Sequence, residues 1–168
     1  MLEHDNHNGD LSHLDERGRA HMVDIGDKPV TVRIARARAE LKMHPTTLTR
    51  IQTGGMQKGD VLAIAQVAAI MAAKRTSDLI PLCHPIPLTG VDVSFTFVES
   101  ERLAIDVVVR TQAQTGVEME AMTAASVGAL TVYDMCKSID REMVIEFVAL
   151  QEKSGGKSGQ FVRIGSDS

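Results

Sequence analysis

A thiol and an imidazole lie side by side in a stiff turn of this chain. Cys83 and His84 are enclosed by Pro81 and Pro85. Each proline fixes its own backbone φ and restricts the residue before it, so we expect residues 78–85 to be rigid and non-helical. Such a turn can transfer protons or contact a ligand. Taken alone, however, a Cys-His pair is more often a small buried thiol beside a hydrogen-bonded imidazole.

A carboxylate and an ammonium group stand three residues apart at the end of a long apolar helix pattern. Asp134 and Lys137 therefore share one face of that helix. On an open surface this would be a weak ion pair. The pattern is too apolar for an open surface, and it also holds Tyr133 and Cys136. A covered Asp/Lys pair is costly unless it is well paired, so the spacing favours an acid/base role.

Two further carboxylates occur near the start of the same helix pattern. Thr115 and Glu118 match a capping box, in which Thr115 is the N-cap and Glu118 reaches back to it. That structural role accounts for Glu118 about as well as a functional one. Glu120 points to another part of the helix surface and has no local partner that would explain it.

A glycine-rich segment with two lysines follows the last predicted main strand. Residues 153–159 read KSGGKSG and join Lys153 and Lys157 to flexible backbone donors, which is typical of a phosphate-binding loop. The segment is not a Walker A motif, because Gln151 stands where the first glycine is required and no helix follows. A glycine hairpin beside two solvated lysines explains the same residues equally well.

Taken together, these residues suit a polyanionic small molecule that undergoes proton transfers. The set comprises two carboxylates at a helix start, an Asp/Lys pair at its end, the Cys-His turn, and cations at Arg33, Lys58, Lys153 and Lys157. A zinc-type metal site is not indicated, because Cys83, His84 and Cys136 lack the spacing of zinc ligands.

The elements that must position these residues begin with a strand near Val30. Apolar side chains alternate with polar ones from Val30 to Ile34, which predicts a half-buried strand with Arg33 on its more polar face. If the alternation continues, Arg36 and Arg38 lie on the same face as these apolar side chains. Either the strand bends there or that face leaves the core. We expect both arginines to be solvated.

Two long helices and one short helix are predicted. The short helix follows Pro45, with Thr46 and Thr47 as caps. The next begins at Asp60, a suitable N-cap, and ends near Lys74. The longest runs over about residues 117–138 and is apolar around most of its circumference, so it needs cover on more than one side. A sheet can cover one side, and we expect a neighbouring subunit to cover the other.

The remaining segments predict strands. Residues 91–97 and 103–109 alternate in polarity and are joined by a short polar connection, which indicates an antiparallel hairpin. Residues 143–149 form a last main strand, and residues 159–164 can add a short one. The order strand, helix, strand, strand, helix, strand is that of the ferredoxin-like β-α-β-β-α-β fold. This α+β fold has an antiparallel sheet with helices on one face.

Composition excludes several classes of protein. The net charge of −4 and an aromatic content of 3% argue against a nucleic-acid or membrane-surface binder. The two cysteines form no disulfide framework, and no apolar signal or membrane-spanning segment is seen, so we expect a cytoplasmic protein. We predict a mobile N-terminal arm (residues 1–20), one catalytic domain (21–164) and a short tail (165–168).

Three runs of the sequence resemble the molybdenum cofactor biosynthesis protein C family, the cyclic pyranopterin monophosphate synthases. The likeness extends from about His21 to Gly159, and motifs of this length are very specific. The runs are KGDVLAIAQVAAIMAAKRTSDLIPLCHP, TGVEMEAMTAASVGALTVYDMCK and KSGGKSG.

The resemblance implies an enzyme and an assembly. The implied reaction is the rearrangement of 3′,8-cyclo-7,8-dihydroguanosine 5′-triphosphate to cyclic pyranopterin monophosphate, with release of diphosphate. The implied enzyme is a lyase without a tightly bound cofactor, although Mg²⁺ can accompany the triphosphate. The implied assembly is a homohexamer, a trimer of dimers, with active sites at subunit interfaces.

The resemblance also implies roles for matching positions. The acid/base residues would be Lys58, Asp134 and Lys137. The substrate contacts would be Leu82, Cys83, His84, Glu118, Met119 and Glu120, and the phosphates would be held by Lys28, Arg33 and Lys153. We expect Cys83 to contribute shape and backbone contacts, and not nucleophilic attack.

Two rival classes differ in testable ways. A ferredoxin-like RNA-binding module would need exposed strand aromatics and a basic sheet, and this sequence has neither. A catalytically silent oligomer of the same fold that senses a triphosphate could carry the same phosphate contacts. Incubation with the cyclised guanosine triphosphate, followed by assay of diphosphate release, distinguishes that oligomer from an enzyme.

Overall fold

The strand that begins at Thr31 is the centre of the fold because its alternate residues are small enough to lie beneath helices. We describe residues 17–164 in a computed structural model of the protein. In it, β1 (Thr31–Lys42) pairs with antiparallel strands on both sides. Most of the predicted N-terminal arm (1–20) and all of the predicted tail (165–168) lie outside the described residues.

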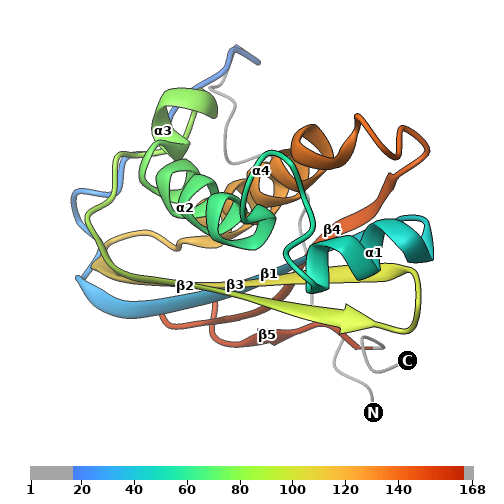
Figure 1. The fold of residues 1–168 in the computed structure, drawn as a ribbon. Coiled ribbons are helices and arrows are strands. Elements are labelled where there is room, and N and C mark those ends of the chain that lie inside the picture. The colour runs from blue at the N-terminus through green and yellow to red at the C-terminus, as the bar shows by residue number, and fades with distance from the viewer. Residues whose placement is uncertain (1–16, 165–168) are drawn as a thin grey trace.

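The other elements follow in the predicted order and confirm the ferredoxin-like α+β fold. The sheet order is β2-β3-β1-β4-β5, every neighbouring pair is antiparallel, and the helices lie on one face (Figure 1). The elements after β1 are α1 (Pro45–Gln52), α2 (Val61–Lys74), α3 (Thr76–Leu79), β2 (Leu88–Val98), β3 (Arg102–Ala113), α4 (Glu118–Cys136), β4 (Val144–Ser154) and β5 (Phe161–Val162).

The prediction of which β1 face is buried was wrong. Ala35, Ala37 and Ala39 are almost fully buried against the helices, whereas 57% of Val32 is exposed on the opposite face. The strand keeps one alternation throughout and needs no bend. Arg33 therefore shares the parity of the buried alanines, at the end of the strand. Small alanines face the helices because larger side chains would hold the two layers apart.

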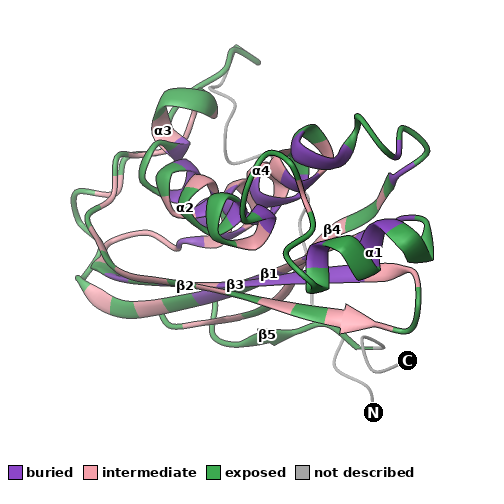
Figure 2. Cartoon of the chain, in the orientation of Figure 1, coloured by how far each residue is buried: buried purple, intermediate pink, exposed green. Residues whose placement is uncertain are grey.

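Helix α4 is positioned by close contact with both α2 and the sheet. Its residue Gly128 is buried, and a Cβ there would lie 3.5 Å from the Cβ of Ala69 in α2 and 3.6 Å from Ile105 of β3. The buried residues of this layer, purple in Figure 2, include alanines of both helices. These are ordinary van der Waals distances, so α4 packs closely against both neighbours at this position.

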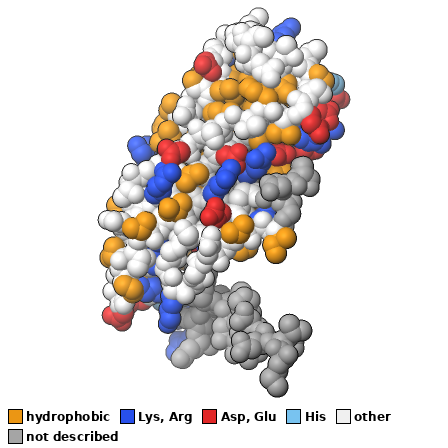
Figure 3. All heavy atoms as spheres, turned by 90° about the horizontal axis from the view of Figure 1, so that it is seen from below, with side chains coloured by type: hydrophobic (Ala, Val, Ile, Leu, Met, Phe, Trp, Pro, Cys, Tyr) orange, Lys and Arg blue, Asp and Glu red, His pale blue; other side chains and the backbone are white. Residues whose placement is uncertain are grey.

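Arginines on the other sheet face are paired and not merely solvated. Asp106 of β3 is only 7% exposed, and it accepts hydrogen bonds from Arg36 and Arg38 at 3.2 Å each. Figure 3, seen from below, shows acidic and basic side chains interspersed on this side of the molecule. The prediction that both arginines are solvated therefore holds only in part, since about half of the Arg36 side chain is exposed and a quarter of that of Arg38.

The predicted helix starts are confirmed in one case and wrong in another. Asp60 caps α2 by accepting a hydrogen bond from the Ala63 amide at 3.0 Å. At α1 the N-cap is His44 and has no side-chain cap bond, so Thr46 and Thr47 are not the caps. The segment from Asp78 was expected to be non-helical, but its first two residues complete the short helix α3.

Candidate active site

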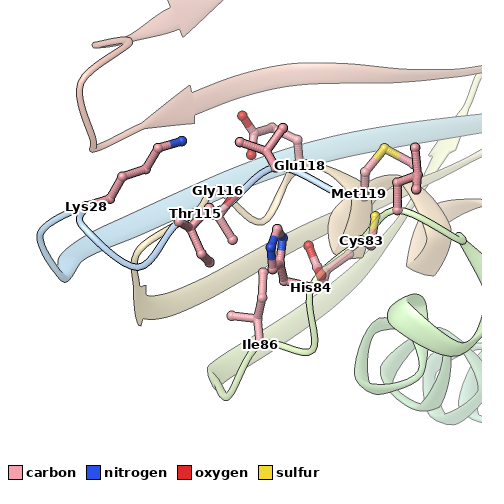
Figure 4. Close-up of a pocket in the computed structure, with 12 residues that line it drawn as sticks. Lys28, Cys83, His84, Ile86, Thr115, Gly116, Glu118 and Met119 are labelled. Atoms are coloured by element: carbon pink, nitrogen blue, oxygen red, sulfur yellow. The ribbon is translucent and has the colours of Figure 1, made fainter. Parts of the chain in front are cut away.

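A hollow of about 400 Å³ lies between the Cys-His turn and the start of α4. The turn contributes Leu82, Cys83 and His84, and the helix contributes Glu118, Met119 and Glu120. In Figure 4 Cys83 of the turn lies beside Met119 of the helix start, and Lys28 reaches toward the hollow from a third segment. The two segments are at least 34 positions apart in the sequence. The structure thus brings together six of the residues predicted to contact substrate.

Burial controls the ionisation of two groups in this hollow. Glu120 is 4% exposed, and its desolvation raises the pKa of the carboxyl group, although its own backbone N–H partly opposes this and Glu118 adds to it. Burial also raises the pKa of the Cys83 thiol, with a smaller contribution from the Glu120 carboxylate. The hollow therefore shifts the Glu120 carboxyl and the Cys83 thiol toward their protonated forms.

A second hollow of about 760 Å³ adjoins the first and carries the cations. Lys28, Thr115, Gly116 and Glu118 line both hollows. The second is also lined by Arg33 and by Gly156, Lys157 and Ser158 of the glycine-rich segment. The predicted phosphate-binding loop and the predicted phosphate-binding lysine and arginine are thus in one place.

Arg33, one of the predicted phosphate-binding cations, already has hydrogen-bond partners within the chain. Arg33 donates from Nε to the Ala113 carbonyl and from Nη2 to the Gln114 carbonyl, both at 3.1 Å. Gly156 has a φ of +76°, and a Cβ on it would collide with the Arg33 guanidinium. The glycine is therefore required both by its backbone conformation and by the close approach to Arg33.

The carboxylate of Glu118 bridges the helix start and the glycine-rich segment. It accepts a hydrogen bond from Lys153 Nζ at 2.9 Å, and Lys153 also lies 3.4 Å from the Ser158 hydroxyl. The predicted capping box was wrong, because Val117 is the N-cap, no side chain caps the helix, and Glu118 is the first helical residue. Glu118 thus bonds to β4 and not to its own helix terminus. Lys28 and Lys157, by contrast, have no ion pair within residues 17–164.

The three predicted acid/base residues form a separate cluster at the far end of α4. Lys137 Nζ donates to Asp134 Oδ1 at 2.6 Å, and Lys58 Nζ donates to the Asp134 backbone carbonyl at 3.0 Å and lies 3.9 Å from Oδ2. The hydrogen bond and charge of Lys137, followed by the charge of Lys58, lower the pKa of the Asp134 carboxyl group. The pairing was predicted, but its burial was not confirmed: the Asp134 side chain is 60% exposed.

One subunit does not bring this cluster to the two hollows. Glu118 and Asp134 are 16 residues apart on one continuous helix, which places them about 24 Å apart along its axis. The α-helix is uninterrupted between these two residues, so it cannot fold back on itself. Any site that uses both groups of residues must therefore combine different copies of the chain.

Several lining residues were not anticipated. Val23 and Ile25 cover the first hollow from the segment before β1, and Ile86 covers it from beyond the Cys-His turn. Only their apolar character marks them in the sequence, and this is shared with core residues. Gln114 lines the second hollow and also donates to the Gly26 carbonyl at 3.0 Å, so it fixes the segment that carries Lys28.

Residues 17–164 show neither a metal-binding cluster nor a membrane-spanning helix. These residues contain no cluster of three or more His, Cys, Asp or Glu side chains arranged to hold a metal ion. None of the helices they form combines the length and apolar character needed to cross a bilayer.

Comparison with known proteins identifies the family. Residues 22–156 match the model of the MoaC family. The chain is 60% identical over 154 residues to the cyclic pyranopterin monophosphate synthase of Roseiflexus sp. (strain RS-1), covering 91% of this chain and 98% of that protein. It is 57% identical over 153 residues to the enzyme of the same name from Brevibacillus brevis, covering 91% and 96%. It is 55% identical over 157 residues to cyclic pyranopterin monophosphate synthase 1 of Mycobacterium tuberculosis (strain H37Rv), covering 94% and 92%. The chain therefore belongs to the MoaC family.

Proposed function

We propose that this protein is a cyclic pyranopterin monophosphate synthase, a lyase of molybdenum cofactor biosynthesis. Its substrate would be 3′,8-cyclo-7,8-dihydroguanosine 5′-triphosphate and its second product diphosphate. The observation that carries the proposal is the pair of adjoining hollows, one lined by a buried carboxyl, a thiol and an imidazole, and the other by cations. A nucleotide with a heterocycle at one end and a triphosphate at the other matches that division.

The first hollow would hold the heterocycle. The Glu120 carboxyl can accept a hydrogen bond from a ring N–H, and His84 can donate or accept one through its ring nitrogens. Met119 and Leu82 supply apolar contact to the ring faces. The raised pKa of Cys83 supports a role in shape, because the thiolate and not the thiol is the nucleophile.

The second hollow would hold the triphosphate. Lys28, Arg33 and Lys153 are the expected ligands, and Lys157 joins them as a fourth cation from the same glycine-rich segment. Forming a cyclic phosphate and expelling diphosphate places extra negative charge on the phosphate oxygens, which clustered cations stabilise. Mg²⁺ bound to the triphosphate would add to that charge. The protein itself would need no tightly bound cofactor.

Lys58, Asp134 and Lys137 would carry out the proton transfers. Opening the imidazole ring of the guanine and closing a pterin ring requires several proton transfers without any redox change. Asp134 would orient Lys137 through the 2.6 Å hydrogen bond and keep Lys58 close by. Lysine is suited to this work because its ammonium group can donate a proton and its neutral amine can accept one.

A complete site would need a second copy of the chain. The two halves of the site stand about 24 Å apart on α4, so one copy would supply the hollows and another the lysine cluster. Ile64, Val67 and Met71 follow one another at helical spacing on α2 and are 45–57% exposed, an apolar stripe that a further subunit could cover. We propose a homohexamer, a trimer of dimers, acting in the cytoplasm.

Diphosphate release distinguishes this enzyme from a silent triphosphate sensor of the same fold. The purified protein should convert the cyclised guanosine triphosphate to the cyclic monophosphate and one equivalent of diphosphate. A sensor would bind the same nucleotide and leave it unchanged. Tight binding without diphosphate release would contradict the proposed function.

A further inference from the structure

Asp140, just beyond the end of α4, is a buried carboxylate that the proposed reaction does not use. Only 3% of Asp140 is exposed to solvent. Its Oδ2 accepts hydrogen bonds from the His44 backbone N–H at 2.9 Å and from the Thr47 hydroxyl at 3.0 Å, and its Oδ1 accepts one from the Glu142 backbone N–H at 3.2 Å. A buried carboxylate with three donors is held in one orientation.

These bonds join two segments that are far apart in the sequence. His44 and Thr47 form the first turn of α1, whose own N-cap side chain makes no cap bond. Asp140 therefore ties the first turn of α1 to a segment 96 residues away, where its negative charge also complements the helix dipole. The ring of His44 lies 3.1 Å from the Glu142 carboxylate and adds a second contact between the same segments.

Both joined segments carry lysines of the acid/base cluster. Asp140 N donates to the Cys136 carbonyl at 3.1 Å, which continues the end of α4 directly after Asp134 and Lys137. The chain that leaves α1 leads through Gly54 to Lys58. Asp140 and Lys58 both act on the buried Cys136 thiol, whose pKa is raised to about 11 mainly by its burial. Asp140 is thus a close neighbour of the cluster formed by Lys58, Asp134 and Lys137.

We propose that Asp140 is a positioning residue that holds the end of α4 against the start of α1, and so keeps Asp134 and Lys137 in register with Lys58. The inference rests on the proposed function, since that is where the three residues act. Asp140 touches none of the groups assigned to substrate. Its effect on the reaction would pass through the geometry of the cluster.

The test is a comparison of five full-length proteins by two measurements. The proteins are the wild type, Asp140→Ala, Thr47→Val, Thr47→Ser and Asp106→Asn. The first measurement is the pKa of Asp134, followed through its ¹³Cγ NMR signal and assigned with Asp134→Asn. The second is kcat and KM for diphosphate release. Thr47→Val removes one of the three bonds without changing charge, and it keeps the test usable if Asp140→Ala does not fold.

In Asp140→Ala, and more weakly in Thr47→Val, the pKa of Asp134 should rise toward its ordinary value of 3.8, because its bond to Lys137 loosens. Merely deleting the negative charge of Asp140 would lower that pKa, so the direction separates positioning from simple electrostatics. We expect kcat to fall about tenfold to a hundredfold in Asp140→Ala, with KM within about twofold. Thr47→Ser should restore wild-type values.

Asp106→Asn is the control for a general loss of stability. Asp106→Asn breaks another buried carboxylate network, remote from the cluster, and should lower the melting temperature without moving the pKa of Asp134. An unchanged or lowered pKa of Asp134 in folded Asp140→Ala or in Thr47→Val would overturn the inference. A wild type without turnover would instead contradict the proposed function, and the NMR comparison would still decide the role of Asp140.

Discussion

At the scale of single residues, burial decides what the reactive groups can do. Glu120 has no local partner in the sequence, and in the folded chain its burial raises its pKa. Several of the residues that line the hollows were predicted from the sequence. Their environments could not be predicted, because the Cys-His turn that lines the same hollow as Glu120 comes from a segment almost forty residues earlier. The unexpected pairing of Glu118 with Lys153 has the same origin.

The raised pKa of Glu120 predicts that stability falls as pH rises. Between its ordinary value of 4.5 and its higher folded-state pKa, the unfolded chain has released the proton while the folded protein keeps it. Every tenfold difference in proton affinity between the two states is worth about 1.4 kcal/mol. Denaturant unfolding of the wild type and Glu120→Gln, from about pH 4 to about pH 8, should therefore show a growing advantage for the glutamine variant.

The control for that comparison is Glu152→Gln, since Glu152 is exposed on β4 and water already solvates its side chain. This variant should follow the wild type at every pH. Equal pH dependence in the wild type and Glu120→Gln would show that the Glu120 carboxyl is not desolvated in the folded protein.

The lysines of the cluster give a second prediction at this scale. Lys58→Ala and Lys137→Ala should each fold and bind substrate, yet lose about 10²-fold to 10⁴-fold in kcat, because each removes a proton donor or acceptor. Lys74→Ala, an exposed lysine at the end of α2, should keep wild-type kinetics. Turnover like that of the wild type in either cluster variant would remove that lysine from the mechanism.

At the scale of elements, alternation and helical periodicity predicted the order of strands and helices well. They failed where tertiary contacts replace local ones. The apolar residues at the start of β1 were assigned to the core, but the helices lie over the alanines of the other face. The caps of α1 and α4 were assigned to nearby threonines, whereas neither helix has a side-chain cap; at the start of α1, Asp140 of a distant segment instead accepts hydrogen bonds from His44 and Thr47. Neither outcome follows from local sequence.

The glycine-rich segment after β4 yields a prediction about an element. Gly156→Ala should weaken substrate binding about tenfold, because a Cβ would displace the Arg33 guanidinium and disturb charged hydrogen bonds worth about 1.5 kcal/mol or more. Gly159→Ala is the matched control, since its φ of +69° carries the same backbone cost but a Cβ there would meet nothing within 4 Å. Equal KM values for the two variants would show that only backbone strain matters.

At the scale of the whole molecule, the length of α4 governs how the site can be built. The helix carries half of the candidate site at each end, with about 24 Å between them. The sequence predicted carboxylates of both halves on one helix, and the family resemblance implied active sites at subunit interfaces. The geometry of the helix separates them within a subunit, and the exposed apolar stripe of α2 offers a surface through which copies could join.

Subunit mixing tests directly whether two copies share each site. Lys137→Ala removes a residue of one half, and the double variant Lys28→Ala with His84→Ala removes residues of the other. Each protein alone should be nearly inactive. Co-expressed in equal amounts, they should form mixed oligomers with about a quarter of wild-type diphosphate release, because one site in four combines two intact halves. Mixed oligomers that form but release no more diphosphate than the separate variants would contradict a site shared between subunits.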